Sequence, residues 1–328
     1  MAYSEQVIMR ARARLEEDRR ERERENERRR EIAYARYPRL PEIERKLRLT
    51  MTKLIANTLR NGEDPSAAVA AIKKENLELQ RQREWILSSE EDLDYENPIC
   101  TVCDGTGYIG STMCSCLKEL CRQEQKKELT SLLGNGRETF DTFRLEYYPD
   151  IPDTVLGVSP RKLMYQNLKI CRKYAETFGP GGGNLFFTGP TGLGKTFLSA
   201  CIARQVADRG YSVVYESAIR VFKDFETEKF GQQQEESLGL SRKYLECDLL
   251  IIDDLGTEMT TQFVISALYQ IVNSRMMNNQ ATIISTNLTA EALEQRYSPQ
   301  IASRITGGYR MVKFVGEDIR RMKKGGKS

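Results

Sequence analysis

A phosphate-binding pattern is the most distinctive chemistry in this chain. Residues Gly189–Thr196 read Gly-Pro-Thr-Gly-Leu-Gly-Lys-Thr, which matches GxxxxGK[ST]. The glycines allow backbone N–H groups to point at phosphate oxygens, and the start of a following helix adds partial positive charge. Lys195 is expected to reach the β- and γ-phosphates, and the Thr196 hydroxyl to bind Mg²⁺. The predicted nucleotide-binding residues are Gly189, Pro190, Thr191, Gly192, Leu193, Gly194, Lys195, Thr196 and Phe197.

Two later segments supply the polar side chains that such a site needs. The apolar run 249–252 is followed by Asp253 and Asp254. We expect Asp253 to hold Mg²⁺ through water, and Asp254 to orient or deprotonate the attacking water. The run 282–286 ends at Asn287, whose amide can position water beside the γ-phosphate. Asp254 is one methylene shorter than glutamate, which suggests slow hydrolysis. The predicted catalytic residues of these motifs are Lys195, Asp253, Asp254 and Asn287.

The order of these segments predicts the fold of the second half of the chain. Strands are expected at 184–188, 212–216, 249–252 and 281–286, with a helix at 196–209 after the phosphate-binding loop. Apolar strands that alternate with helices indicate a parallel sheet with helices on both faces. We therefore predict an α/β fold of the P-loop NTPase type. No guanine-reading NKxD sequence stands in a suitable place, which favours ATP over GTP.

A cluster of cysteines forms a second candidate site. Cys100, Cys103, Cys114 and Cys116 surround the glycine-containing run 104–108. Glycines allow the tight turn that places a CxxC pair over a metal, and four thiolates suit tetrahedral Zn²⁺. The chain contains no histidine, so four protein ligands at this site must all be cysteines. Cys121 is the competing fourth ligand; reduced cysteines without metal and an iron–sulfur cluster are the alternatives.

The first half of the chain predicts helices. Between Arg10 and Arg30 there are ten Arg and seven Asp or Glu, which indicates either a solvated helix or a disordered arm. Apolar residues at helical spacing over 41–61, and again after Pro65 towards Ile86, predict a helical hairpin. Its apolar face either closes within the hairpin or docks a protein. We divide the chain into a charged arm (1–36), a helical and zinc-binding domain (37–136), a linker (137–159) and an ATPase domain (160–328).

Composition excludes several classes of protein. The chain has 328 residues, 40% of them hydrophobic, with 50 Lys or Arg against 47 Asp or Glu. Without histidine there can be no Ser-His-Asp triad, no Cys-His pair and no HExxH protease site. No apolar stretch approaches the ~18 residues of a membrane-spanning helix, and the N-terminus lacks a signal-peptide core. We expect a cytoplasmic protein.

Five segments together carry a resemblance to a known family: Gly189–Thr196, Asp253–Gly256, Ser285–Leu288, Ala302–Ile305 and Phe314–Arg320. They resemble AAA+ ATPases of the bacterial DnaC/DnaI type, which load replicative helicases, and their relatives, the IstB-type transposition ATPases. The resemblance covers roughly residues 140–320. It implies an AAA+ sheet without a C-terminal helical lid, an N-terminal zinc module, and Asn287 as the sensor. It also implies that Arg304 is an arginine finger for a neighbouring subunit, with Arg296 as a second candidate.

The resemblance implies a function as well. We expect an ATP-dependent loader that delivers a hexameric replicative helicase onto single-stranded DNA. The expected partners are the helicase hexamer, single-stranded DNA and further copies of the chain, and the expected cofactors are ATP, Mg²⁺ and Zn²⁺. ATPase activity is expected to be weak or stimulated by a partner. Two alternatives stay open: a helper ATPase of transposition, and a non-catalytic adaptor that is switched by nucleotide.

Overall fold

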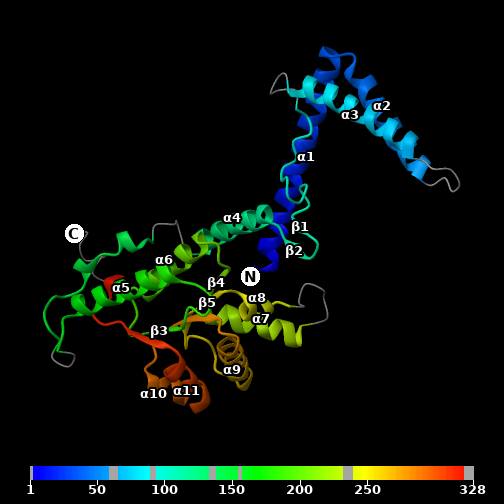
Figure 1. The fold of residues 1–328 in the computed structure, drawn as a ribbon. Helices are drawn as coiled ribbons and strands as arrows, with labels where there is room; N and C mark the ends of the chain where they lie inside the picture. Colours follow the sequence, from blue (N-terminus) through cyan, green and yellow to red (C-terminus); the bar gives the residue numbers. More distant parts are fainter. Residues whose placement is uncertain are drawn as a thin grey trace. The chain divides into compact units, whose positions relative to one another are not determined.

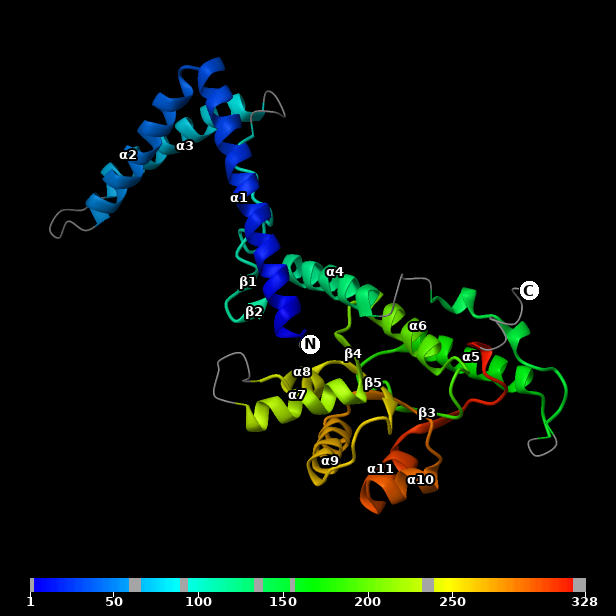
Figure 2. The ribbon, with the colours of Figure 1, turned by 180° about the vertical axis from the view of Figure 1, so that it is seen from behind.

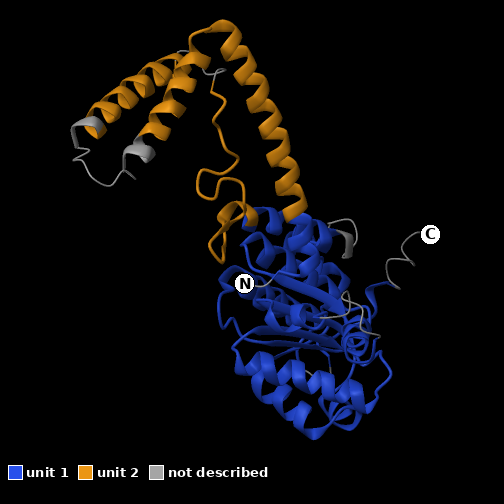
Figure 3. Ribbon diagram, turned by 90° about the vertical axis from the view of Figure 1, so that its right-hand side faces the viewer, with its two compact units in different colours: residues 1–11, 118–328 blue, residues 12–117 orange. Residues whose placement is uncertain are grey.

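The structure is a computed structural model of the chain, and it describes residues 3–58, 66–88, 94–132, 138–153, 157–231 and 239–320. The chain forms two compact units (Figure 3). Unit 1 comprises residues 1–11 and 118–328, and unit 2 comprises residues 12–117. Helices α1 (Glu5–Arg36) and α4 (Ser115–Leu132) each run through a boundary between the two. The predicted functional divisions after residues 36, 136 and 159 stay a prediction.

Unit 1 contains a five-stranded parallel sheet. Its strands are β3 (Leu185–Thr188), β4 (Val213–Ser217), β5 (Leu249–Leu255), β6 (Ala281–Thr286) and β7 (Arg310–Lys313), in the order β4-β5-β6-β3-β7. The four predicted strands are confirmed. The fifth, β7, lies at an edge, and only Val312 of its four residues is buried. One buried residue in four leaves no apolar run, which is why the sequence did not predict this strand.

Helices cover both faces of this sheet (Figures 1 and 2). The helices of unit 1 after α4 are α5 (Pro160–Thr177), α6 (Lys195–Asp208), α7 (Ala218–Phe230), α8 (Arg242–Glu246), α9 (Gln262–Met277), α10 (Ala290–Arg296) and α11 (Pro299–Gly308). Alternate residues of the central strands enter two separate cores: on β5, Ile251 packs with α5 and α6, and Ile252 packs with α7 and α9. The predicted α/β architecture with two covered faces is confirmed.

The free edge of β4 is covered by polar and aromatic contacts. On α4, the buried Gln125 accepts a hydrogen bond from Val213 N at 2.9 Å and donates one to Tyr211 O at 2.9 Å. The hydroxyl of Tyr3, just before α1, donates to Gly210 O at 3.3 Å. An edge strand with unpaired backbone groups invites unwanted strand pairing. These side chains satisfy backbone groups at and beside that edge.

Unit 2 contains the predicted helical hairpin, which is formed by α2 (Leu40–Thr58) and α3 (Ser66–Ser88). A short antiparallel pair follows, β1 (Tyr108–Ile109) with β2 (Thr112–Met113). Residues 12–36 belong to α1, so the charged arm is helical, one of the two alternatives left open by the sequence. Ion pairs between residues four apart, such as Arg20 with Glu16, lie along its exposed face.

Among the described residues no helix has the length and apolar character needed to cross a membrane.

One carboxylate joins the three helices of unit 2. The side chain of Glu44 on α2 is 12% exposed and accepts hydrogen bonds from the hydroxyls of Tyr34 and Tyr95. It also lies 3.3 Å from Nε of Arg83 on α3 and 3.6 Å from a guanidinium nitrogen of Arg30 on α1. Burial raises the pKa of Glu44, but the hydrogen bonds from the two tyrosines and Arg83 outweigh it, so the net pKa lies below its usual range.

Replacing Glu44 with glutamine should therefore destabilise unit 2 by about 3 kcal/mol, because four donors lose a charged acceptor. The exposed Glu42→Gln, which breaks only an i,i+4 pair with Lys46, should cost under about 0.5 kcal/mol. Urea unfolding followed by the fluorescence of Trp85, the single tryptophan, measures both. Because folding lowers the pKa of Glu44, the ionised carboxylate stabilises unit 2. This stabilisation is present above about pH 4.5 and is lost as the pH falls below that value. Equal effects of the two variants would contradict this role.

Candidate nucleotide site and cysteine cluster

The predicted phosphate-binding loop, residues Gly189–Thr196 and called the P-loop below, joins β3 to α6. Gly189, Gly192 and Gly194 have φ values of 141°, 75° and 87°, which side chains rarely adopt. A Cβ atom on Gly189 would collide with the Phe314 carbonyl, and one on Gly192 would collide with the Asp318 carboxylate. Gly189 therefore requires glycine for conformation and for space, and Gly192 requires it for conformation.

Lys195 lies inside this loop rather than in solvent. It is 4% exposed, and its Nζ donates hydrogen bonds to Gly189 O at 2.7 Å, Pro190 O at 2.8 Å and Asn287 Oδ1 at 2.7 Å. Burial lowers the pKa of Lys195, although the Asp254 and Asp253 carboxylates oppose that effect. The structure thus brings together two of the predicted catalytic side chains, Lys195 and Asn287.

The two adjacent aspartates have different surroundings. Asp253 is 7% exposed and accepts hydrogen bonds from the Tyr215 hydroxyl at 2.7 Å and from the Ser285 hydroxyl. Asp254 has a left-handed φ of 55° at an irregularity in the β5–β6 pairing, and its side chain lines the cavity next to the P-loop. Burial and the neighbouring Asp253 raise the pKa of Asp254, against the effects of Lys195 and Arg320. A change in register redirects a side chain, and here it points Asp254 at the cavity.

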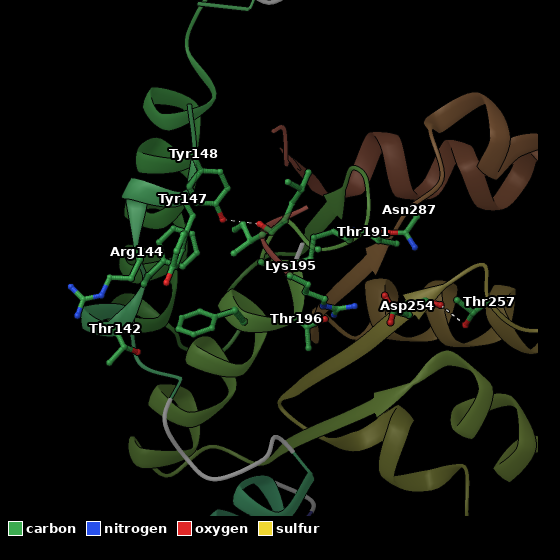
Figure 4. Close-up of a pocket in the computed structure, with 17 residues that line it drawn as sticks. Thr142, Arg144, Tyr147, Tyr148, Thr191, Lys195, Thr196, Asp254, Thr257 and Asn287 are labelled. Carbon is green, nitrogen blue, oxygen red and sulfur yellow. Dashed lines mark hydrogen bonds between the residues drawn. The ribbon is translucent and has the colours of Figure 1, made fainter. Parts of the chain in front are cut away.

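A cavity of about 570 Å³ lies over the P-loop. Figure 4 shows Thr191, Lys195 and Thr196 between Asp254 and Asn287 on one side and Tyr147 and Tyr148 on the other. The volume of the cavity is within the range of small-molecule sites, ~300–1,000 Å³. The lining residues are Thr142, Phe143, Arg144, Tyr147, Tyr148, Thr191, Gly192, Leu193, Gly194, Lys195, Thr196, Phe197, Asp254, Thr257, Asn287, Ile319 and Arg320.

One wall of this cavity is aromatic and comes from the region 137–159, for which the sequence predicts only a linker. The segment forms two short 3₁₀ helices, Phe140–Thr142 and Leu145–Tyr147. Phe143 stacks on Tyr148 with ring centroids 5.8 Å apart and lies 5.6 Å from the ring of Phe197. The Tyr148 hydroxyl donates to Leu193 O at 2.9 Å, which ties the wall to the P-loop. Four aromatic residues within 140–148 were the available signal.

The segment after β7 forms a further wall. The Ile319 backbone N–H donates to Gly192 O at 3.1 Å, and Arg320 lines the cavity. The Asp318 carboxylate accepts a hydrogen bond from Arg320 N at 2.9 Å and packs against Gly192. In the sequence this segment stands out only by its resemblance to loaders, and no role is predicted for Arg320.

Neither predicted candidate for an arginine finger lines the cavity of its own chain. Arg304 on α11 donates to Asn273 Oδ1 at 3.0 Å and to the Tyr269 hydroxyl at 2.7 Å. Arg296 on α10 donates to the backbone carbonyl of Glu258 at 2.6 Å. An arginine that serves a neighbouring subunit must lie away from its own nucleotide site, and both residues meet that condition.

The four predicted cysteine ligands lie together in unit 2. Their Sγ atoms are all within 4.8 Å of one another, with Cys100 3.8 Å from Cys114 and Cys103 3.4 Å from Cys116. A tetrahedron with Zn–S bonds of about 2.3 Å has edges of about 3.8 Å, so the donor set and its size fit Zn²⁺. The group found among the described residues does not include Cys121, a buried residue of α4 in unit 1.

Thiolate character is uneven within the cluster: the pKa values of Cys103 and Cys114 are lowered, whereas burial and then hydrogen bonding with Cys103 raise the pKa of Cys116. The Gly107 backbone N–H donates to Cys103 Sγ at 3.3 Å, and Asp104, Gly105 and Gly107 all have positive φ values. Burial raises the pKa of Cys103, but hydrogen bonds from Cys116 and Gly107 outweigh it and lower the pKa to about 6. In contrast, burial raises the pKa of Cys121 to about 11. A thiolate is the form that binds a metal.

Comparisons with known proteins agree with the P-loop site. The sequence model of the IstB-like ATP binding protein family matches residues 173–324. The chromosomal replication initiator protein DnaA of Aliarcobacter butzleri is 27% identical over 163 residues, 48% of this chain and 33% of that protein. The replicative helicase loader DnaI of Bacillus subtilis is 28% identical over 140 residues, 42% of this chain and 43% of that protein.

The chain thus spans less than half the length of these two relatives. A solved structure of the DnaC helicase loader aligns with 55% of this chain and 98% of its own length, at 20% identity and a TM-score of 0.45. The match to the family model covers the P-loop, both aspartates and Asn287. Residues 173–324 of this chain therefore form an IstB-like ATP-binding domain.

Proposed function

We propose that this protein is an ATP-dependent loader that delivers a hexameric replicative helicase onto single-stranded DNA. The observation that carries the proposal is the cavity over the P-loop, where Lys195, Asp254 and Asn287 meet within a domain of the IstB-like family. Similarity to the replicative helicase loader DnaI supports the choice of partner. The hydrolytic activity is proposed to be slow or stimulated by a partner.

The predicted residues of the P-loop, of the Asp253–Asp254 pair and at Asn287 have proposed roles in or beside this cavity. Backbone N–H groups of the P-loop bind the phosphates, and the Lys195 ammonium neutralises charge on the β- and γ-phosphates. Thr196 and Asp253 would hold Mg²⁺, since oxygen ligands suit that ion, and it would supply positive charge to the transferring phosphoryl group. Asp254 takes a proton from the attacking water, for which its raised pKa makes it a better base. Asn287 orients that water.

The aromatic wall is proposed to bind the adenine base. Phe143→Ala should raise the KM for ATP about tenfold with little change in kcat, since stacking a base on an aromatic ring contributes ~1–3 kcal/mol. Tyr165→Ala on α5, which removes another exposed aromatic ring of unit 1, should leave the KM unchanged. Steady-state ATPase assays on both variants measure this. An unaltered KM in Phe143→Ala would place the base elsewhere.

Arg320 is proposed to contact the γ-phosphate from within the same chain. It lines the cavity, and its charge acts on both Lys195 and Asp254. Arg320→Ala should lower kcat about tenfold or more, because a cation aimed at developing phosphate charge stabilises the transition state. Arg320→Lys should retain part of the rate. The exposed Arg310→Ala on β7 serves as the matched control, and a wild-type kcat in Arg320→Ala would refute the contact.

Self-association through the ATPase domain is proposed to complete each nucleotide site. Arg304, or alternatively Arg296, would reach the γ-phosphate bound by a neighbouring subunit. Mixing Lys195→Ala chains with Arg304→Ala chains creates some interfaces in which both functional groups are present. Such mixtures should recover ATPase activity that neither variant has alone. Failure to recover it under conditions where the chains assemble would count against Arg304.

Unit 2 is proposed to bind Zn²⁺ at the four cysteines and to contact the helicase. A cytoplasmic location, with its reducing conditions, suits the four thiolates and is part of this proposal.

A helper ATPase of transposition is the second candidate, because the matching family is IstB-like. A pull-down from native lysate with ATP or a non-hydrolysable analogue discriminates the two: recovery of a helicase supports a loader, and recovery of a transposase supports the helper. ATP hydrolysis that is lost in Asp254→Asn would exclude a non-catalytic adaptor.

A further inference from the structure

Trp85 is the most exposed large aromatic side chain of unit 2. It is the single tryptophan of the chain and is 72% exposed. Its exposure follows from helical geometry: Ile72, Leu79 and Ile86 recur every seven residues on the face of α3 that packs in unit 2. Trp85 precedes Ile86 by one residue and is rotated about 100° away from that face. Trp85 therefore lies outside the packed face and presents its indole to solvent.

Arg81 and Arg39 share this surface with Trp85. Arg81 stands one helical turn before Trp85 on α3, and Arg39 lies where the chain passes from α1 into α2. Both line the same groove as the indole, together with Pro38 and Ile43. No ion pair or side-chain hydrogen bond of Arg39 or Arg81 occurs among the described side chains of residues 3–53, 69–88 and 94–130, and the same holds for the indole of Trp85. The groove therefore presents an exposed indole ring beside two arginines that have no ion-pair partner among the described side chains.

The charge around the groove restricts what it can bind. Residues 36–53 and 69–88 of the hairpin contain ten Lys or Arg and five Glu. A single Glu, Glu78, lines the groove itself. A flat exposed ring with flanking guanidinium groups matches a partner that has both aromatic bases and phosphates. An acidic polypeptide would match the charge alone, and would leave the indole face without a planar partner.

We propose that the groove formed by Trp85, Arg81 and Arg39 binds single-stranded nucleic acid, with a base stacked on Trp85 and phosphates paired with the two arginines. This site is in unit 2 and is separate from the nucleotide cavity of unit 1. The inference goes beyond loading as such, because it assigns one point of nucleic-acid contact to the helical hairpin.

Trp85 itself reports on the site, since no other tryptophan contributes to fluorescence. Adding a 20-nucleotide thymidine oligonucleotide to the full-length protein should quench its tryptophan emission, and added salt should weaken the binding. Arg81→Glu and Arg39→Glu should each weaken the affinity measured by quenching at least about fivefold. Arg45→Glu, an equal change of charge at an exposed position of α2 outside the groove, should weaken it less than twofold. A labelled oligonucleotide extends the test to Trp85→Ala, for which anisotropy should show a loss of roughly 5- to 100-fold.

The competing outcomes are distinct. Oligonucleotide binding seen by anisotropy without quenching of Trp85 would overturn this site while leaving the proposed loading function intact. Quenching by poly-glutamate but not by the oligonucleotide would overturn it in favour of an acidic protein partner. If Arg45→Glu and Arg81→Glu weakened the affinity for the oligonucleotide equally, the effect would come from the overall charge of the protein, and the site would also be refuted. Quenching that depends on Arg81 and Arg39, in a protein that fails to load a helicase, would support the site and count against the loader.

Discussion

Lys195→Ala should lower the rate of ATP hydrolysis about 10²–10³-fold, the usual cost of removing a preorganised group that stabilises charge in the transition state. The Lys195 ammonium is already enclosed by the carbonyls of Gly189 and Pro190 and by the Asn287 amide oxygen. Because these three hydrogen bonds use all three of its N–H donors, Lys195 must exchange some of them for phosphate oxygens when ATP binds. A radioactive or coupled ATPase assay in single-turnover conditions measures the change.

A matched control separates this effect from a general loss of charge. Lys223→Ala removes an exposed lysine from α7 of the same unit and should leave the rate unaltered. Because Lys195 is buried, its removal also leaves two loop carbonyls without their donor. Thermal melting therefore has to accompany the assay. A folded Lys195→Ala protein that hydrolyses ATP at the wild-type rate would refute the assignment of the P-loop as the catalytic site.

Zinc removal is expected to have the largest effect on stability. Residues 100–116 have few apolar side chains to bury and are held by turns at positive φ, so metal binding would supply on the order of 10 kcal/mol for their folding. Purified protein should contain one zinc per chain. Cys114→Ser, which removes a buried ligand, should reduce the zinc content well below one and lower the melting temperature of unit 2.

Cys121→Ala is the control for that experiment. Cys121 is as buried as Cys114 but lies outside the group of four sulfurs. Its replacement should leave the zinc content at one per chain. Metal analysis after dialysis against a weak chelator measures both variants. Zinc that is lost from Cys121→Ala and kept in Cys114→Ser would show that the ligand set is wrong.

The sequence predicted the parts of the site that depend on local pattern. The P-loop, the strand before Asp253 and the strand before Asn287 each consist of adjacent residues, so their spacing alone identifies them. The cysteine cluster was predictable for the same reason. Parallel strands end at one edge of the sheet, which is why Lys195 and Asn287, distant in sequence, could be expected to meet.

The missing parts depend on contacts between distant segments. Phe143 and Tyr148 form a wall only because Tyr148 reaches Leu193 across 45 residues. Arg320 enters the cavity only because Ile319 pairs with Gly192 in the P-loop. Equally, no local pattern shows that Tyr215 and Ser285 hold Asp253 while Asp254 faces the cavity. Such pairings follow from strand order and register, which spacing along the chain does not encode.

The most direct measurement of the loading proposal uses a closed circle of single-stranded DNA, onto which a helicase ring cannot thread from an end. The hexameric replicative helicase of the same genome is mixed with the circle, ATP and this protein, and the helicase that elutes with DNA is quantified by gel filtration. We expect helicase to elute with the circle when wild-type protein and ATP are both present, and not with Lys195→Ala. Equal loading without this protein, or with Lys195→Ala in its place, would contradict ATP-dependent loading by this protein.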